Sequence, residues 1–440
     1  MSNDLDFYRL KGLEYGQLTG VNIGVHALDD AFMLMHCGVG CKHKTTSQLS
    51  SHDLARNVVE REGWTEVGDA ELITGASGRI GPYLRSWYAR VQPSLIVVIS
   101  VTFLDLTGED LPFVVKEEGE TIPCPVLRVS APGTGGDLFL GYQNMVIAVL
   151  RTLDWKKKAQ NAKGVAILGY YFDRYEGDHI GNLQQLGALL KILGLELQGV
   201  AFSGVSIDKL QAIPEQKYQL VFPLLQPKIK RIQRFTKRNL IEIHLPIGVR
   251  LTSEWLQIIG KEHGVPERLL QQVLHKKEEQ TREKLQIAQR RCFGLKIGIV
   301  ADLPHAIGLY SLLQELGFQV VFVGLRGDSF GGSAEFKEAL ERHKLPIEME
   351  LDILEHPSLQ ALITLVDELG QLDELDGLIA SATEINAIEN NLCWEGKKPF
   401  LLEFGFPCRD YHVTRPTPYM GYVGCLAFAD RILSVLSRRY

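Results

Sequence analysis

The feature that most constrains the fold of this chain is a repeated alternation of short apolar runs with segments of helical periodicity. The run Leu95–Ser100 is continuously apolar, which is typical of a parallel strand covered on both faces. We predict strands at 95–100, 125–130, 165–168, 197–202, 296–301, 319–323, 347–351, 378–381 and 400–404. Helical patterns of about 10–15 residues separate most of them, and such alternation produces βαβ units. The sequence therefore predicts an α/β fold of three Rossmann-like domains with parallel sheets.

The order of these patterns also predicts where the domains begin and end. For 440 residues, length alone suggests about three domains. We expect an N-terminal α/β domain at 1–160, a second Rossmann-like domain at 161–250, a helical connector at 251–292 and a C-terminal Rossmann-like domain at 293–440. The N-terminal domain would carry the cysteine-rich loop described below.

Composition excludes several classes of protein. A net charge of −6 without a long basic block argues against nucleic-acid binding. No apolar stretch approaches the ~18 residues of a membrane span. Seven cysteines, an odd number with no recognisable secretory signal, do not suggest a disulfide framework. We expect a cytoplasmic protein whose thiols are free to bind metal.

The segment Met35–Lys44 contains two cysteines, Cys37 and Cys41, with two glycines between them. Glycine lets the backbone and the thiolate approach the same bound ligand closely. The flanking Lys42–Lys44 would favour a thiolate or an anionic cluster. Two thiols cannot complete a metal site. A buried strand end with two unrelated thiols therefore stays open as an alternative.

Other residues of the N-terminal domain are further candidates for this site. Cys124 lies beside a predicted strand and either faces the site or packs in the core. His36, His43 and His52 cluster in the sequence and could supply a proton or a ligand, although single histidines more often lie at the surface. The remaining thiols are expected to be structural: Cys292, Cys393, Cys408 and Cys425.

A glycine-rich segment, Glu71–Gly81, has the pattern of a strand, a glycine turn and the start of a helix. Its TGxxGxxG spacing resembles the cofactor loop of short-chain dehydrogenases. That loop belongs at the beginning of a chain, with an acidic residue after the next strand. Here the next strand ends in Ser100 and Val101, and no tyrosine is followed by lysine four residues later. We expect the loop to be structural rather than nicotinamide-binding.

Four motifs in the same order resemble the nitrogenase component 1 family, on its β-type side. The motifs are Gly40–Cys41, Thr107–Leu111, Leu245–Gly248 with Thr252 and Glu254–Leu256, and Phe404–Asp410 with Arg415 and Gly421–Gly424. The resemblance implies three-domain subunits that pair with a homologous α-type partner, as a heterotetramer of two α-type and two β-type chains. It also implies a shared iron–sulfur cluster and electrons from an ATP-hydrolysing iron protein, which uses the ATP itself.

The resemblance assigns a ligand to Cys41, which stands where the family has its Gly-Cys cluster ligand. The other two ligand positions of a nitrogenase β subunit would fall near Tyr15 or Gly16 and near Thr102, and none of these is a thiol. An eight-iron cluster is therefore not expected. A 4Fe–4S cluster shared with the partner is compatible, with Cys37 as an added ligand or a neighbour.

Three functions follow from these patterns. The first is an oxidoreductase subunit, active only in complex, that reduces a small molecule: a tetrapyrrole, a small sulfur or nitrogen compound, or a cofactor precursor. The second is a scaffold that holds an iron–sulfur cofactor during assembly and catalyses no metabolic reaction. The third is a cluster-free α/β protein that binds a metabolite through its glycine loops.

Overall fold

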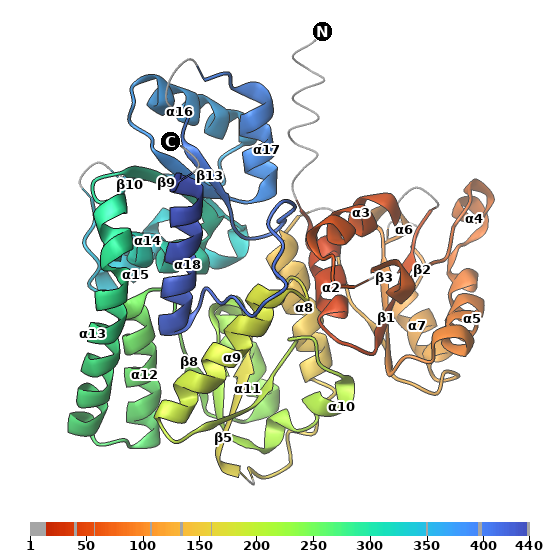
Figure 1. Cartoon of the computed structure of the whole chain (residues 1–440). Helices are drawn as coiled ribbons and strands as arrows, with labels where there is room; N and C mark the ends of the chain where they lie inside the picture. The colour runs from red at the N-terminus through yellow and green to blue at the C-terminus, as the bar shows by residue number, and fades with distance from the viewer. Residues whose placement is uncertain are drawn as a thin grey trace. The chain divides into compact units, whose positions relative to one another are not determined.

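The computed structural model describes residues 15–38, 42–56, 58–105, 108–132, 135–159, 161–348, 351–394 and 398–437 (Figure 1). The packing divides the chain into two compact units. One contains Tyr15–Tyr175 and Leu197–Glu242, and the other contains Glu176–Glu196 and the chain from Ile243 onward. Apart from Glu196, the strands of the first two sheets lie in the former unit, and those of the third sheet lie in the latter.

The first sheet has the order β2-β1-β3-β4, and its pairings are all parallel. Its strands are β1 (Ala31–His36), β2 (Glu62–Trp64), β3 (Leu95–Ser100) and β4 (Val126–Arg128). Every residue of the two central strands, β1 and β3, is buried, as their apolar sequences predict. Phe32 and Ile96 pack with Leu84 of the helix α5 (Ile80–Val91) in the core on one face.

The second and third sheets repeat the same architecture. The second has the order β6-β5-β7-β8, with β5 (Asn161–Leu168), β6 (Glu196–Val200), β7 (Gln216–Val221) and β8 (Leu240–Glu242). The third has the order β11-β10-β9-β12-β13, with β9 (Lys296–Asp302), β10 (Gln319–Arg326), β11 (Asp352–Glu355), β12 (Gly377–Ala380) and β13 (Phe400–Glu403). Three sheets with parallel pairing agree with the predicted fold class.

The helices up to β8 in the chain are α2 (Gln17–His26), α3 (Lys42–His52), α4 (Asp69–Thr74), α5 (Ile80–Val91), α6 (Thr102–Asp105), α7 (Leu111–Gly119), α8 (Leu138–Leu150), α9 (Gly177–Ile192), α10 (Ile207–Leu210) and α11 (Ile229–Thr236). Those that follow are α12 (Val249–His263), α13 (Glu267–Cys292), α14 (Leu303–Glu315), α15 (Ser333–Arg342), α16 (Leu359–Gln371), α17 (Ala382–Asn391) and α18 (Gly421–Leu436). The predicted helical connector corresponds to α12 and α13, which are separated at Gly264. The domain boundaries at 160, 250 and 292 stay predictions.

Two glycines let α2 and α8 approach backbone to backbone. A Cβ on Gly20 would lie 1.7 Å from the Leu138 carbonyl oxygen, and one on Gly141 would lie 1.9 Å from the Gln17 carbonyl oxygen. Real Cβ atoms cannot occupy such positions, so any larger residue would force the helices apart. This contact fixes the helix that leads into β1.

Two local expectations are wrong. Glu71–Ile73 lies in the helix α4 rather than in a strand. The predicted strand at 347–351 precedes β11, which begins at Asp352, and residues 349 and 350 lie outside the described residues. The strand prediction at Glu71–Ile73 failed because two adjacent apolar residues, Leu72 and Ile73, are compatible with either a strand or a helical turn.

Candidate functional site

The carboxyl end of the first sheet contains a topological switch point. The chain leaves β1 towards β2 on one side and leaves β3 towards β4 on the other, so the loops after β1 and β3 diverge. Open α/β sheets bind ligands in the crevice at such points. His36, the last residue of β1, lies opposite Ser100, the last residue of β3. The cysteine loop therefore begins at the position in this sheet where the fold favours a ligand site.

Cys37 is held rigidly at this position. Its backbone N–H donates to Thr65 Oγ1 at 3.2 Å, and its carbonyl oxygen accepts from the Val67 N–H at 2.8 Å. The side chain is fully buried. Residues 39–41, including Cys41, lie outside the described residues, as does the His43 side chain. The structure thus places the first thiol of the loop, and the ligand position at Cys41 stays a prediction.

His36 contributes an imidazole directly before this thiol. Its Nδ1 lies 2.9 Å from Thr65 Oγ1, while Nε2 is buried and has no hydrogen-bond partner among the described residues. Burial lowers the pKa of His36 to about 4, although Glu109 and Asp105 oppose that shift. The ring is therefore neutral near pH 7. When Nδ1 donates to Thr65, Nε2 carries a free lone pair, the form that binds a metal.

Charged groups pair with one another around this edge. Asp105 Oδ1 accepts from Ser100 Oγ and from Arg128 Nη2, the latter at 3.2 Å. Arg79 Nη1 donates to the Thr65 and Glu66 carbonyl oxygens at 2.7 Å each. These contacts fix the ends of β3 and β4 and the segment that supports His36 and Cys37.

The glycine loop is already bound by a carboxylate of the same chain. Glu109 accepts from the backbone N–H groups of Ala76 at 3.2 Å and Ser77 at 3.0 Å, and from Ser77 Oγ at 2.7 Å. These are donors of the kind that would cradle a pyrophosphate in a dinucleotide-binding turn. The segment also follows a helix rather than a strand. Both observations support the expectation that this loop is structural.

Cys124 lies at the other end of the sheet. It precedes β4, and the carbonyl oxygen of its neighbour Pro125 accepts from the Ile96 N–H near the start of β3. From Ile96 to Ser100 the strand rises about 13 Å. The Cys124 side chain packs against the core beside β1 and β3, and burial raises its pKa. The structure therefore does not bring Cys124 together with Cys37.

Two residues that sequence reasoning missed support the loop. Glu62 is fully buried and accepts from Asn22 Nδ2 at 2.7 Å and from Thr46 Oγ1 at 2.8 Å. Because Thr46 belongs to α3, this carboxylate ties the helix after the cysteine loop to α2. Thr65 bonds both His36 and Cys37. No local pattern marks either residue, since their partners are distant in the sequence.

The remaining candidates lie elsewhere. His52 is fully buried, and its Nε2 lies 3.7 Å from Asp173 Oδ2. Cys292, Cys408 and Cys425 are buried, as expected for structural thiols. Cys393 is exposed instead, because its polar loop does not pack in the core.

The Phe404–Asp410 motif forms a loop closed on its own carboxylate. Glu403 Oε2 accepts from the backbone N–H groups of Arg409 at 3.1 Å, Asp410 at 2.9 Å and Tyr411 at 3.1 Å. Cys408 Sγ lies 3.0 Å from the same oxygen. The Glu403 carboxylate therefore satisfies three successive backbone donors of this loop.

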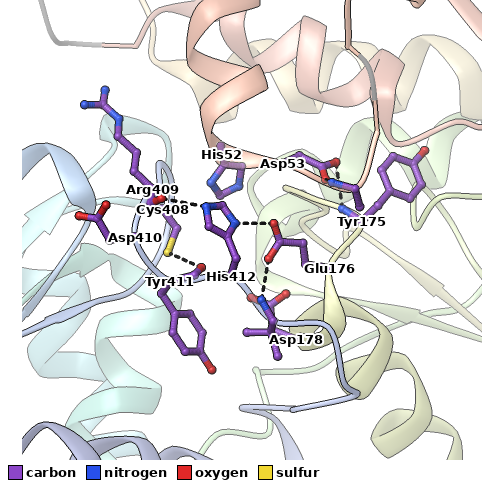
Figure 2. A network of polar contacts seen from close by, with 12 residues as sticks. His52, Asp53, Tyr175, Glu176, Asp178, Cys408, Arg409, Asp410, Tyr411 and His412 are labelled. Atoms are coloured by element: carbon purple, nitrogen blue, oxygen red, sulfur yellow. Dashed lines mark hydrogen bonds and ion pairs between the residues drawn. The ribbon is translucent and has the colours of Figure 1, made fainter.

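Figure 2 shows how the loop continues at His412. Its Nδ1 lies 2.6 Å from Glu176 Oε1, and its Nε2 lies 2.8 Å from the Arg409 carbonyl oxygen. Glu176 Oε2 also accepts from the Val413 N–H at 2.9 Å. These contacts anchor the loop to the start of α9.

Comparison with known proteins identifies the family. The family described as nitrogenase component 1 type oxidoreductase matches residues 17–437. The chain belongs to this family. The nitrogenase iron-molybdenum cofactor biosynthesis protein NifE of Clostridium pasteurianum is 22% identical over 94% of this chain and 85% of its own length. The nitrogenase molybdenum-iron protein beta chain of Methanococcus maripaludis is 21% identical over 96% of this chain and 93% of its own length.

Further similarities cover less of the chain or concern the fold alone. One component chain of the light-independent protochlorophyllide reductase of Heliobacterium modesticaldum is 22% identical over 59% of this chain and 50% of its own length. A solved structure of "Nitrogenase Cp1 at pH 6.5" covers 97% of this chain and 92% of its own, with a TM-score of 0.78 at 17% identity. The predicted family and the predicted α/β fold are confirmed. The assignment to the β-type side stays a prediction, because both NifE and beta chains are among the relatives.

No helix in the described ranges is long and apolar enough to cross a bilayer. The predicted cytoplasmic location stays a prediction.

Proposed function

We propose that this chain is a subunit of a nitrogenase-like, multi-electron oxidoreductase that holds a 4Fe–4S cluster shared with a homologous partner subunit. The observation that carries the proposal is the carboxyl end of β1, where the buried thiol of Cys37 follows an imidazole whose buried Nε2 has no partner among the described residues. Thiolates and imidazoles are the donors that iron–sulfur clusters use in proteins. The residues present therefore fit such a group.

Within this proposal, Cys41 is the ligand that this chain supplies, and Cys37 lines the site. When bound, the cluster would accept and pass on single electrons. Thr65 fixes the His36 ring and the Cys37 backbone, and Glu62 fixes α3 after the loop. Contacts of this kind orient ligands and tune the potential of the group they hold. Ligands absent from this chain would come from the partner, because four ligands can be divided between subunits.

The proposal includes two partners and a substrate. A homologous α-type subunit would complete the cluster site in a heterotetramer, and an ATP-hydrolysing iron protein would deliver electrons. The substrate is a small molecule whose class the sequence and structure leave open among a tetrapyrrole, a small sulfur or nitrogen compound, and a cofactor precursor.

The second candidate function is an assembly scaffold for an iron–sulfur cofactor. The full-length similarity to a protein named for cofactor biosynthesis favours it. The small number of thiols at the family's ligand positions also favours it. The third candidate, a cluster-free metabolite-binding protein, loses the support of the glycine loop at 75–81, because Glu109 bonds the donors of the Ala76–Ser77 turn.

The test is anaerobic purification of the chain together with its homologous partner, followed by iron analysis and electron paramagnetic resonance. We expect a 4Fe–4S signal in the complex and little in the chain alone. Addition of the iron protein with MgATP should reduce the cluster if the complex is a reductase. Transfer of iron to an apo-acceptor without sustained electron uptake would favour the scaffold. A complex without iron would contradict both.

A further inference from the structure

A cluster of two histidines and one glutamate lies in the unit that contains the third sheet. His244 follows β8, Glu254 lies on α12 and His343 caps the end of α15. One potential ligand atom from each of these residues lies within 4.8 Å of those of the other two. His343 is buried and the other two are half-buried. Three donors from three separate elements thus converge on one point.

The hydrogen bond of His244 determines which of its ring nitrogens could bind a metal. His244 Nε2 lies 2.8 Å from the Leu251 carbonyl oxygen, which can only accept, so this nitrogen carries the proton. His244 Nδ1 therefore has the lone pair. Metal-binding histidines in proteins usually donate their second N–H to a carbonyl or carboxylate in this way.

The other two members already form a close pair. His343 Nδ1 lies 2.7 Å from Glu254 Oε2, and the His244 and His343 rings meet edge to face with centroids 4.7 Å apart. Zn²⁺ bonds of about 2.0–2.2 Å hold tetrahedral ligands roughly 3.4 Å apart. A metal would therefore replace the His343–Glu254 hydrogen bond after a small separation of the two side chains.

We propose that His244, Glu254 and His343 form a binding site for a divalent transition metal of the Zn²⁺ class. Two imidazoles and one carboxylate are a known ligand set for Zn²⁺ with a fourth position open to water. Nitrogen ligands select such ions over Mg²⁺ or Ca²⁺, which prefer oxygen. The Glu254 side chain is 27% exposed, so solvent reaches the cluster.

The bound ion would join three segments that are distant in the sequence. It would link the loop after β8 to the first half of α12 and to the end of α15. The site uses no cysteine and is independent of the proposed iron–sulfur function. The competing explanation is a hydrogen-bonded cluster without metal, in which Arg250 Nε, 3.4 Å from Glu254 Oε1, helps to neutralise the carboxylate.

The experiment measures metal binding by the full-length chain in its purified complex. Zn²⁺ content is determined after dialysis against chelator-buffered zinc, for the wild type and for H244Q, E254Q and H343A. H275Q is the matched control, because His275 and Glu279 form an exposed surface pair on α13 with a 3.3 Å contact. Co²⁺ substitution then reports the ligand type, since a nitrogen and oxygen site gives visible d–d bands without thiolate charge transfer.

We expect the wild type and H275Q to retain one more Zn²⁺ per chain than the three site variants. The affinity of this site should fall by at least roughly 10–100-fold in each variant, since outer-shell changes alone have that effect. The conservative E254Q and H244Q variants keep the side-chain size, so they test the site even if H343A fails to fold. Equal Zn²⁺ content in the wild type and these two variants, or Co²⁺ spectra with thiolate bands only, would overturn the proposal.

Discussion

The first and third sheets share a switch-point topology but differ in the polar groups at their carboxyl ends. In the first sheet, the buried His36 Nε2 has no hydrogen-bond partner among the described residues, and Cys37 follows it. In the third sheet, strand-end carboxylates are bonded within the chain through at least one oxygen, although Glu403 Oε1 is buried without a partner among the described residues. Glu403 accepts three backbone N–H groups, and Asp302 Oδ2 lies 2.8 Å from His305 Nδ1.

This difference shows that a switch point is not by itself a ligand-binding site. A switch point places side chains at the edge of a parallel sheet, but the side chains decide whether a ligand can bind there. At the third sheet a ligand would have to displace the Glu403 carboxylate from its donors. At the first sheet an imidazole nitrogen is already without a partner among the residues described. The predictions below test this contrast, from the largest expected effect to the smallest.

The largest effect is expected from the cysteine loop. Cys41→Ala should abolish or strongly diminish the 4Fe–4S signal of the anaerobically purified complex, because Cys41 matches the family ligand. Cys37→Ala should keep the iron content while the reduction potential moves, because a residue that lines a cluster tunes it. Alanine is preferred to serine, whose alkoxide can stay on iron. Iron analysis and electron paramagnetic resonance measure both outcomes.

Cys393→Ala is the control for this pair, because Cys393 is exposed on a loop after α17. It should leave the signal unchanged. An unchanged cluster in Cys41→Ala would remove the main support for the proposed function. Equal cluster loss in Cys37→Ala would instead make Cys37 a second ligand.

At the third sheet, Glu403→Ala should destabilise the Phe404–Asp410 loop without any ligand being involved. The change leaves three backbone donors without their acceptor at a position that is only 7% exposed. Unsatisfied buried groups cost about 1–3 kcal/mol each. We expect the free energy of local opening to fall by about 3 kcal/mol or more. Hydrogen exchange of the amides at 409–411 measures this change.

Glu403→Gln should have a smaller effect, because its amide oxygen still accepts. Exchange rates in Glu403→Ala that stay close to those of the wild type would show that the carboxylate does not hold this loop.

Thr65→Val tests in the same way whether the Thr65 hydroxyl holds His36 and Cys37 at the carboxyl end of β1. The change keeps the shape but removes the hydroxyl that meets His36 Nδ1 and the Cys37 N–H. We expect the free energy of local opening at Cys37 to fall by about 2 kcal/mol, because two buried groups lose the one partner that they share. Hydrogen exchange of the Cys37 amide measures it.

Thr65→Ser keeps the hydroxyl and is the matched control for that measurement. If both variants exchange alike, the Thr65 hydroxyl is not what fixes the Cys37 backbone.

The smallest effect concerns pH and the start of α12. Glu315 accepts from the Val249 N–H at 2.7 Å and the Arg250 N–H at 2.8 Å. Burial raises its pKa from 4.5 to about 6, against the lowering effect of these bonds. The folded state then binds more protons than the unfolded state between pH 4.5 and 6, so stability falls as pH rises through that window. The expected loss is up to about 2 kcal/mol.

Urea unfolding of the wild type and of Glu315→Gln at pH 4.5 and pH 7 measures this dependence. The wild type should lose more stability than the variant on going to pH 7, because glutamine does not titrate. The same pH dependence in both proteins would show that Glu315 ionises normally.

The sequence by itself determined the layered α/β architecture. Continuous apolar runs such as Leu95–Ser100 must be covered on both faces, and this requirement acts locally, so it can be read without knowing the partners. The same reasoning marked the cysteine loop, because two thiols and two glycines lie within five residues, from Cys37 to Cys41. It failed at Glu71–Ile73, where a short apolar stretch is compatible with either a strand or a helix.

Only the tertiary structure decided which polar groups meet. Glu109 bonds Ser77 across 32 residues, which turns a dinucleotide-like loop into a structural turn. Thr65 and His36 meet across 29 residues, and His343 and Glu254 meet across 89. A hydrogen bond or a metal site depends on atoms brought within a few ångströms by the packing of separate elements. Local sequence periodicity specifies which face of an element is buried, but it does not specify which distant element packs against that face.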